Sequence, residues 1–288
     1  MLIQLQKISK QQHSDLKILH AQCKQSDGNS VPIYDYLLEE DRVLPSTFLY
    51  YQQDQLVGFL SAFFFYDNAC EISLMVAPNH RRKGIAGELL RALLPLMESQ
   101  EMDTLIFSML PGADVARLNQ PGFQYSSSEY QMLRNDPQPI NGDMHGLGIR
   151  SAQEEDIPAL CLLDFLCFPD QRNNMEKRFR DILHDPQFSI FVAELNGSVI
   201  GKAHINWHEQ NARLTDIAIK PDLQGKGLGT SLMIYCINHA VKAGQVNLLL
   251  DVETSNQNAL HLYTNLGFFS VNSCDFWAIS RQNFAQFT

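Results

Sequence analysis

The feature that most constrains this chain is an internal duplication. Two segments, about half of the 288-residue chain apart, share one order of features: a strand-like run, a glycine turn, an amphipathic helix, an apolar strand and a Gly-Phe pair. Arg81 in the first turn corresponds to Gln224 in the second, and Gly122 corresponds to Gly267 at a nearly equal separation. Self-similarity at a fixed separation predicts two domains that share one fold.

The stretch between the two copies predicts where the domains meet. Residues 134–146 are rich in Pro, Asn, Asp and Gly and show no apolar periodicity, which is typical of an exposed linker. We therefore expect an N-terminal domain over residues 1–135, a linker over residues 136–146 and a C-terminal domain over residues 147–288.

Each half predicts an α/β fold built on a mixed sheet. A short strand and an early helix come first, and Asp156-Ile157-Pro158 is a helix-start signal in the second half. Three candidate strands follow, two of which flank Asn196-Gly197, the strongest short-range hairpin signal. A helix, a strand, a helix and final strands complete each half.

Composition limits the possible partners. The chain has 22 basic and 32 acidic side chains, and its net charge of −10 disfavours nucleic acid but suits small cationic substrates. Six cysteines are scattered, the first sixteen residues lack the apolar stretch typical of a signal peptide, and no run of eighteen apolar residues occurs. His204 and His208 lie about 13 Å apart if they share a strand, too far for one metal ion. We expect a soluble, cytoplasmic monomer without metal.

The glycine turn of the second half is the main functional signal. Residues 217–219 end a predicted strand, and residues 224–229 lead into a helix near Thr230. Backbone N–H groups at such a turn point to one place beside a helix N-terminus, so we expect an anion there, and specifically a pyrophosphate. Gly227 and Gly229 would let a phosphate approach the backbone. The dinucleotide-binding fingerprint would need glycine in place of Thr230, and a P-loop would need Ser or Thr in place of Gly227, after the lysine. The turn therefore fits neither motif.

The motifs around this turn resemble those of the GNAT superfamily of acyl-CoA-dependent N-acyltransferases. Its pattern [QR]-x-x-G-x-[GA] is met twice, beginning at Arg81 and at Gln224, and residues 256–268 fit N-x-x-A-x-x-L-Y-x-x-x-G-F. The resemblance covers nearly all of residues 147–288 and, more faintly, residues 1–135. It implies two tandem domains, as in mycothiol synthase, each with a mostly antiparallel sheet whose central strands splay apart. It does not identify the acceptor.

The resemblance also implies where acetyl-CoA binds. The strand before each turn would pair with the pantetheine arm, the turn would hold the pyrophosphate, and Asn256 would contact pantetheine. In the second half the implied residues are Ile217, Ala218, Ile219, Gln224, Gly225, Lys226, Gly227, Leu228, Gly229, Thr230 and Asn256; in the first half they are Leu74, Met75, Val76, Arg81, Arg82, Lys83, Gly84, Ile85 and Ala86.

Acyl transfer to an amine requires a base and benefits from an acid, because an alkylammonium of pKa about 10.4 is almost entirely protonated at neutral pH. By the resemblance, Tyr263 is the acid that protonates the departing sulfur. Asp251 at the end of an apolar strand is the favoured base, with Glu253 in reserve and Asp216 as a third candidate. A further base position of the superfamily falls on Arg213, which cannot act as one.

The first copy lacks this apparatus. Ile106, Pro111 and Leu118 stand where the second copy has Asp251, Asn256 and Tyr263. We therefore expect a catalytically silent N-terminal domain that either binds coenzyme A structurally or supports its neighbour.

Together these features predict an N-acetyltransferase that moves an acetyl group from acetyl-CoA to a primary amine of a small molecule or peptide by direct attack. The alternative is a non-catalytic acyl-CoA sensor or scaffold. The acceptor pocket is expected to border residues 170–173, by resemblance.

Overall fold

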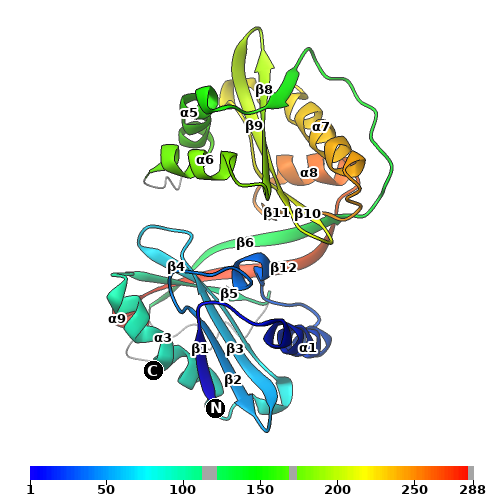
Figure 1. Cartoon of the computed structure of the whole chain (residues 1–288). Helices are drawn as coiled ribbons and strands as arrows, with labels where there is room; N and C mark the ends of the chain where they lie inside the picture. The colour runs from blue at the N-terminus through cyan, green and yellow to red at the C-terminus, as the bar shows by residue number, and fades with distance from the viewer. Residues whose placement is uncertain (112–121, 169–173, 285–288) are drawn as a thin grey trace. The chain divides into compact units, whose positions relative to one another are not determined.

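The computed structural model describes residues 1–111, 122–168 and 174–284 (Figure 1). Its contacts divide the chain into two compact units, Met1–Glu129 with Asn272–Thr288 and Tyr130–Val271. No helix in the described part of the chain is both long and apolar enough to cross a membrane.

This division differs from the predicted one at both ends of the second half. The last strand of the chain belongs to the first unit from Asn272 onward, and the predicted linker belongs to the second. The reason for the first difference is that β5 offers a strand edge, and residues Asp275 to Ser280 pair with Met109 to Thr104 along it. A backbone edge pairs with whichever strand fits it, irrespective of sequence distance.

The first unit is a sheet with the strand order β1-β2-β3-β4-β5-β12. Its elements are β1 (Leu2–Leu5), α1 (Lys10–Asp27), α2 (Asp35–Leu38), β2 (Thr47–Gln52), β3 (Gln55–Phe63), β4 (Ala69–Val76), α3 (Ile85–Ser99), β5 (Thr104–Met109), β12 (Phe269–Ser280) and α9 (Arg281–Phe284). Neighbouring strands are antiparallel except β4 and β5, which are parallel. β6 (Phe123–Arg134) begins in this unit and ends in the other.

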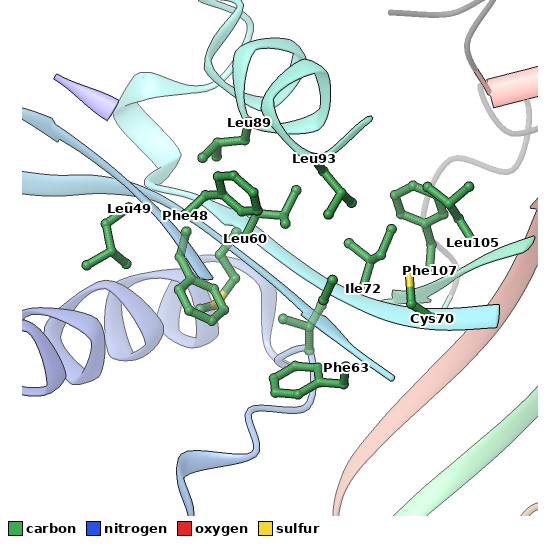
Figure 2. Packing of buried hydrophobic residues seen from close by; sticks show 14 of the residues in the cluster. Phe48, Leu49, Leu60, Phe63, Cys70, Ile72, Leu89, Leu93, Leu105 and Phe107 are labelled. Carbon is green, nitrogen blue, oxygen red and sulfur yellow. The ribbon is translucent and has the colours of Figure 1, made fainter. Parts of the chain in front are cut away.

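The core of the first unit lies on both faces of this sheet. Figure 2 shows Leu89 and Leu93 of α3 packing over one face, while Phe63 lies on the other. α1 covers that second face with Leu16 and Leu19, each 1% exposed. A sheet buried on both faces explains why β3 reads as an almost continuous apolar run.

The second unit repeats this plan. Its elements are β7 (Gly148–Ser151), α5 (Ile157–Cys167), α6 (Met175–Leu183), β8 (Phe188–Leu195), β9 (Ser198–Trp207), β10 (Ala212–Ile219), α7 (Leu228–Lys242), β11 (Leu248–Glu253) and α8 (Gln257–Asn265). Its strand order is β11-β10-β9-β8-β7. α5 and α6 cover one face, and α7 and α8 cover the other (Figure 1).

The predicted hairpin is confirmed. Leu195 pairs with Ser198, so Asn196 and Gly197 form a two-residue turn, and both have positive φ angles of 51° and 75°. A turn with φ positive at both central positions matches the twist of the flanking strands, which is why Asn-Gly is favoured there.

The predicted linker is attached along α7. It has no helix or strand and is mostly exposed, as expected. However, Asn238 of α7 accepts from the Ile140 amide (2.7 Å) and donates to its carbonyl (2.8 Å). Ser231 donates to the Asp143 carbonyl (2.7 Å), and His145 Nδ1 lies 3.2 Å from the Ser231 hydroxyl. These side chains give the segment the backbone partners that a strand would otherwise supply.

Because β12 pairs with β5, a mutation near the C-terminus is predicted to destabilise the first unit. Ile279 is 1% exposed in the core of the first unit, so Ile279→Ala should cost about 2–5 kcal/mol there. Amide hydrogen exchange should accelerate in β5 and stay unchanged in β9. Leu250→Ala, equally buried in the second unit, is the matched control and should have the opposite effect. Faster exchange in β9 alone after Ile279→Ala would contradict the assignment.

Candidate functional site

The second unit contains a strand that leaves its neighbour. β10 and β11 are parallel and pair only at Ala212 with Leu248 and at Arg213 with Leu249. Beyond Arg213, β10 continues to Ile219 with ladder partners on β9 alone. The first unit repeats this arrangement, because β4 pairs with β5 only as far as Ile72. The predicted splay is thus present, and residues 217–219 and 74–76 lie where the strands have separated.

One carbonyl at this free edge is already engaged, in the same way in both units. The Ile219 carbonyl accepts from Gln224 Nε2 (2.9 Å) and from the Cys167 thiol (3.5 Å). In the first unit the Val76 carbonyl accepts from Arg81 Nε (3.0 Å) and from the Cys23 thiol (3.6 Å). The first residue of each turn motif therefore anchors the turn to the strand end. A ligand lying along β10 could therefore form hydrogen bonds with the backbone groups around Ile217.

The second glycine turn presents an uncapped helix N-terminus. Gly225 and Gly227 have φ angles of 75° and 80°, which L side chains rarely adopt, and Gly227 is the N-cap of α7. No side chain among the described residues caps that end, so the first N–H groups of α7 can bind an anion. Lys226 is exposed, and its Nζ lies 3.1 Å from the Asp222 carbonyl. These features fit a pyrophosphate.

Three other predicted residues of this turn have structural surroundings. Leu228 is buried in the core. A Cβ on Gly229 would lie 3.5 Å from Leu262 of α8, an ordinary contact, so this glycine faces α8. Thr230 is half-buried in the first turn of α7.

The first glycine turn keeps the same backbone, and its first residue, Arg81, has an acidic partner that Gln224 lacks. Gly84 (φ 84°) is the N-cap of α3, again without a side-chain cap. Arg81 forms a bidentate ion pair with Asp27 (2.8 and 2.6 Å), and this hydrogen bonding lowers the pKa of the Asp27 carboxyl. Arg82 has a φ of 60°, and Lys83 donates to the Asn79 carbonyl (2.9 Å). Ile85 is buried and Ala86 half-buried in α3.

Asn256 and Tyr263 lie at the two ends of α8. Asn256 is its N-cap, and its side-chain oxygen accepts from the Ala259 amide (3.1 Å), so this atom serves the helix. The Tyr263 ring is 8% exposed and packs edge-on against Phe268, with ring centroids 6.1 Å apart. Burial raises the pKa of Tyr263 to about 12. The phenol is therefore protonated at neutral pH, as a proton donor must be.

The two carboxylates of β11 are exposed and share one strand face. Asp251 forms an ion pair with Arg213 of β10, and Glu253 accepts from the Ser255 hydroxyl (3.0 Å). Leu250 and Val252, which alternate with them along the strand, point into the core on the α7 side, so both carboxylates lie on the α5 and α6 side. Arg213, which occupies a position where the superfamily can have a base, is thus the ion-pair partner of Asp251, the base that the sequence favours.

Asp216 sits at a β-bulge. The pairing of β10 with β9 shifts by one residue between Thr215 and Ala218, and Asp216 has a φ of 51°. β3 and β4 of the first unit pair without any such shift. Bulges redirect side chains and are frequent beside active sites.

A buried polar cluster surrounds this bulge on the α5 and α6 side. We define it as Asp164, Arg178, Lys202, His204, Asn206 and Asp216. Asp216 lies 3.4 Å from His204 Nδ1, 3.6 Å from Arg178 and 3.8 Å from Lys202. Lys202 also pairs with Asp164, and its Nζ lies 4.8 Å from the centre of the Phe179 ring.

The cluster fixes the charge of its two central members. Burial favours the neutral form of Asp216, but the attraction of His204, Lys202 and Arg178 outweighs it and holds the pKa of this carboxyl well below its usual range. Burial lowers the pKa of His204, against the opposing pull of Asp216. At neutral pH the pair is therefore a carboxylate beside a neutral imidazole.

The sequence indicated Asp216 as a third candidate base and argued against His204 as a metal ligand. It did not predict the cluster that contains both residues. The available signal was the period-two row Lys202, His204 and Asn206 in an otherwise apolar strand, which places three polar side chains on one face. Their partners on α5 and α6 could not be read locally.

In the first unit, residues 29–32 lie against β4 and β12. Asn29 Nδ2 donates to the Ser273 hydroxyl (2.8 Å), and Asn272 Nδ2 donates to the Ser30 carbonyl (2.8 Å). Ser73 of β4 donates to the Pro32 carbonyl (2.6 Å). Ile106 is paired within the sheet, whereas Leu118 and residues 170–173 lie outside the described residues.

Comparisons with known proteins agree with the duplicated architecture. The family model described as acetyltransferase (GNAT) family matches residues 13–118 and 157–268. The mycothiol acetyltransferase of Propionibacterium freudenreichii subsp. shermanii is 26% identical over 216 residues, 70% of this chain and 68% of its own.

Two solved structures resemble the chain over nearly its whole length. A GCN5-related N-acetyltransferase from Sphaerobacter thermophilus has a TM-score of 0.76 at 15% identity, covering 97% of this chain and 96% of its own. A tandem GNAT protein from the clavulanic acid biosynthesis pathway has a TM-score of 0.68 at 14% identity, covering 98% of each. At such identities the likeness concerns the fold. Each family match falls in one unit, and the predicted α/β fold is confirmed; the chain belongs to the acetyltransferase (GNAT) family and carries two of its domains in tandem.

Proposed function

We propose that the second unit transfers an acetyl group from acetyl-CoA to a primary amine of a small molecule or peptide by direct attack. The observation that carries the proposal is continuity: the free edge of β10 leads within a few residues into an uncapped α7 N-terminus. A strand edge can pair with an amide-containing arm, and a helix N-terminus can bind its pyrophosphate. Acetyl-CoA has both parts in that order.

The residues of the turn divide the binding work. The backbone around Ile217 pairs with the pantetheine amides, while Gln224 holds the turn against Ile219 rather than contacting ligand. Gly225 and Gly227 allow the turn to approach the pyrophosphate, and Lys226 adds charge to it. The Asn256 amide nitrogen is left for pantetheine, because its oxygen caps α8.

Tyr263 is the proposed acid. Its pKa of about 12 keeps the phenol protonated, and it donates to the departing sulfur of the thioester. Its burial excludes water from the leaving group.

Asp251 and Glu253 are proposed to attract and orient the acceptor's ammonium group. Both are exposed on the α5 and α6 side, and the net charge of −10 favours a cationic acceptor. Asp251 as final proton acceptor is less favoured, because Arg213 already compensates its charge. Glu253 has no such cationic partner in the described residues, and it stays the alternative.

The first unit is proposed to be catalytically silent and empty of acetyl-CoA. Its turn keeps the backbone for a phosphate, but Ile106, Pro111 and Leu118 stand where the second unit has Asp251, Asn256 and Tyr263. The segment 29–32 joins β4 to β12 at the end of β4 that has left β5. The unit then serves to support its neighbour.

The function is tested with a panel of primary amines, among them alkylamines, amino acids, amino sugars and short peptides, assayed with acetyl-CoA for thiol release. Turnover with at least one class supports acetyltransfer. Acetyl-CoA binding without amine-dependent thiol release for any class would instead favour the sensor.

Tyr263→Phe should reduce kcat about 10²-fold or more while leaving acetyl-CoA affinity within a few-fold, because the ring stays and only the proton donor is lost. Thiol-release kinetics and calorimetry measure the two effects. Tyr235→Phe, on the same face of the core but outside the site, is the control and should keep both. Unchanged turnover in Tyr263→Phe would remove Tyr263 from the mechanism.

The two turns offer a matched pair of variants. Gly227→Ala and Gly84→Ala introduce the same backbone strain, about 1–2 kcal/mol, at φ angles of 80° and 84°, and only Gly227→Ala adds a side-chain contact, with His145. Calorimetry on the unmodified chain should count one acetyl-CoA per chain. Gly227→Ala should weaken binding tenfold or more, in part because its Cβ would meet His145, while Gly84→Ala should not. Two ligands per chain, or a loss of affinity in Gly84→Ala, would show that the first unit binds.

A further inference from the structure

The starting observation is a row of buried polar side chains on β9. Lys202, His204 and Asn206 are at most 3% exposed and face α5 and α6. Lys202 has Asp164 as its ion-pair partner, whereas His204 Nε2 and Asn206 Oδ1 are buried without a partner among the described residues. Buried polar atoms are almost always satisfied, so this unpartnered pair calls for an explanation.

Both unpartnered atoms are acceptors. Asp216 Oδ2 lies 3.4 Å from His204 Nδ1 and is ionised, so it can only accept and Nδ1 must carry the proton. In the neutral imidazole this leaves a lone pair on Nε2. The Asn206 oxygen also only accepts. A molecule that satisfies both must donate two hydrogen bonds, which water does and which suits a site of proton transfer.

The two copies provide an internal comparison. In register, Phe59, Ser61 and Phe63 of β3 occupy the places of Lys202, His204 and Asn206, since Gly58 and Gly201 begin the equivalent pairings. The bulge that carries Asp216 is likewise confined to the second unit. Phenylalanines thus replace Lys202 and Asn206, and His204 is replaced by a buried serine that bonds with Arg42 and Thr47. Among the described residues, the imidazole and the carboxylate at the bulge occur together only in the unit proposed to be catalytic.

The position of Asp216 and His204 also suits a role in proton transfer. Asp216 is directly followed by Ile217, at the free edge proposed to hold the thioester arm. Its side chain is 23% exposed whereas that of His204 is 1% exposed, so the dyad links the surface of this edge to the interior.

From these observations, and resting on the proposed function, we propose that His204 accepts the proton of the acceptor amine through a buried water shared with Asn206, with Asp216 as the residue that positions the imidazole. One proton passes from the ammonium through the water to Nε2, and is later released to solvent. The amine nitrogen then forms a bond to the acetyl carbon and the carbon–sulfur bond breaks. Tyr263 protonates the sulfur and regains a proton lost by the nitrogen, so one proton is released per turnover.

The imidazolium formed is compensated by its surroundings. Asp216 on β10 stabilises its charge, while Lys202 on β9 and Arg178 on α6 oppose it, and Asp164 on α5 offsets Lys202. This balance allows the ring to take a proton and to give it up again. With burial lowering the pKa of His204, the acid limb of the kcat profile should fall below the ordinary histidine value of 6.5, with activity lost as pH decreases through it.

The first test uses the unmodified full-length protein. Nitrogen-15 NMR of the histidine side chains should show His204 as the neutral Nδ1–H tautomer at pH 7. A predominant Nε2–H tautomer would overturn the proposal, since no lone pair would then face the interior. This measurement does not depend on activity.

The second test is kinetic, with the best amine of the panel. His204→Gln should lower kcat about 10²-fold or more at pH 7, with acetyl-CoA affinity unchanged and with a rate that rises with pH as the amine deprotonates unaided. Asp216→Asn should lower kcat only about tenfold, because the His204 imidazole is still present and loses only the residue that positions it. Phe179→Leu, which disturbs the packing against the His204 ring, should lower stability and keep the pH profile.

The outcomes separate the two proposals. No amine-dependent thiol release by the unmodified chain contradicts the proposed function. An active chain whose His204→Gln variant keeps its rate and pH profile contradicts the role of His204 alone. If that variant does not fold, an unchanged rate in Asp216→Asn contradicts the role of the dyad instead.

Discussion

The separation of β10 from β11 after only two paired residues is the constraint on which the site depends. Backbone N–H and C=O groups inside a sheet need partners, and a strand that loses its neighbour must find them elsewhere. One is found locally, since Gln224 and Cys167 both donate to Ile219. The others stay available to a ligand. That the first unit repeats the separation and the engaged carbonyl, with Arg81 and Cys23, shows that the arrangement is inherited by both copies.

Much of this could be predicted because its determinants are local. Asn196-Gly197 specifies a hairpin through its own backbone preferences, and the hairpin is present. The glycines at 225 and 227 specify a turn through positive φ angles, and the turn leads into α7 as expected. The duplication indicated the architecture, since a fold found in one half must serve the other. Local chemistry and repetition together were enough for the fold and for the position of the glycine turn.

The rest depends on contacts that sequence spacing does not encode. Strand β12 has the same apolar alternation whichever edge it joins, so its pairing with β5 could not be chosen from the pattern. Arg213 was visible only as an unsuitable base, whereas its ion pair with Asp251 requires the two strands to be neighbours at that point. The partners of Lys202 come from α5 and α6, elements that no motif connects with β9.

The buried cluster is difficult to explain as a stabilising device. Moving a charged side chain out of water costs several kcal/mol of solvation free energy. Replacing a buried ion pair by apolar side chains of similar volume therefore often leaves the stability of a protein unchanged or raises it by about 1–4 kcal/mol. The first unit has a less polar solution, with Phe59 and Phe63 in place of Lys202 and Asn206 and with Ser61, which bonds with Arg42 and Thr47, in place of His204. A duplicated fold thus offers both versions, and the one with Lys202, His204 and Asn206 leaves two acceptor atoms unsatisfied. Packing alone therefore does not account for the polar version, whereas the proposed proton transfer beside the bulge at Asp216 does, since residues held at uncommon φ angles cluster at functional sites.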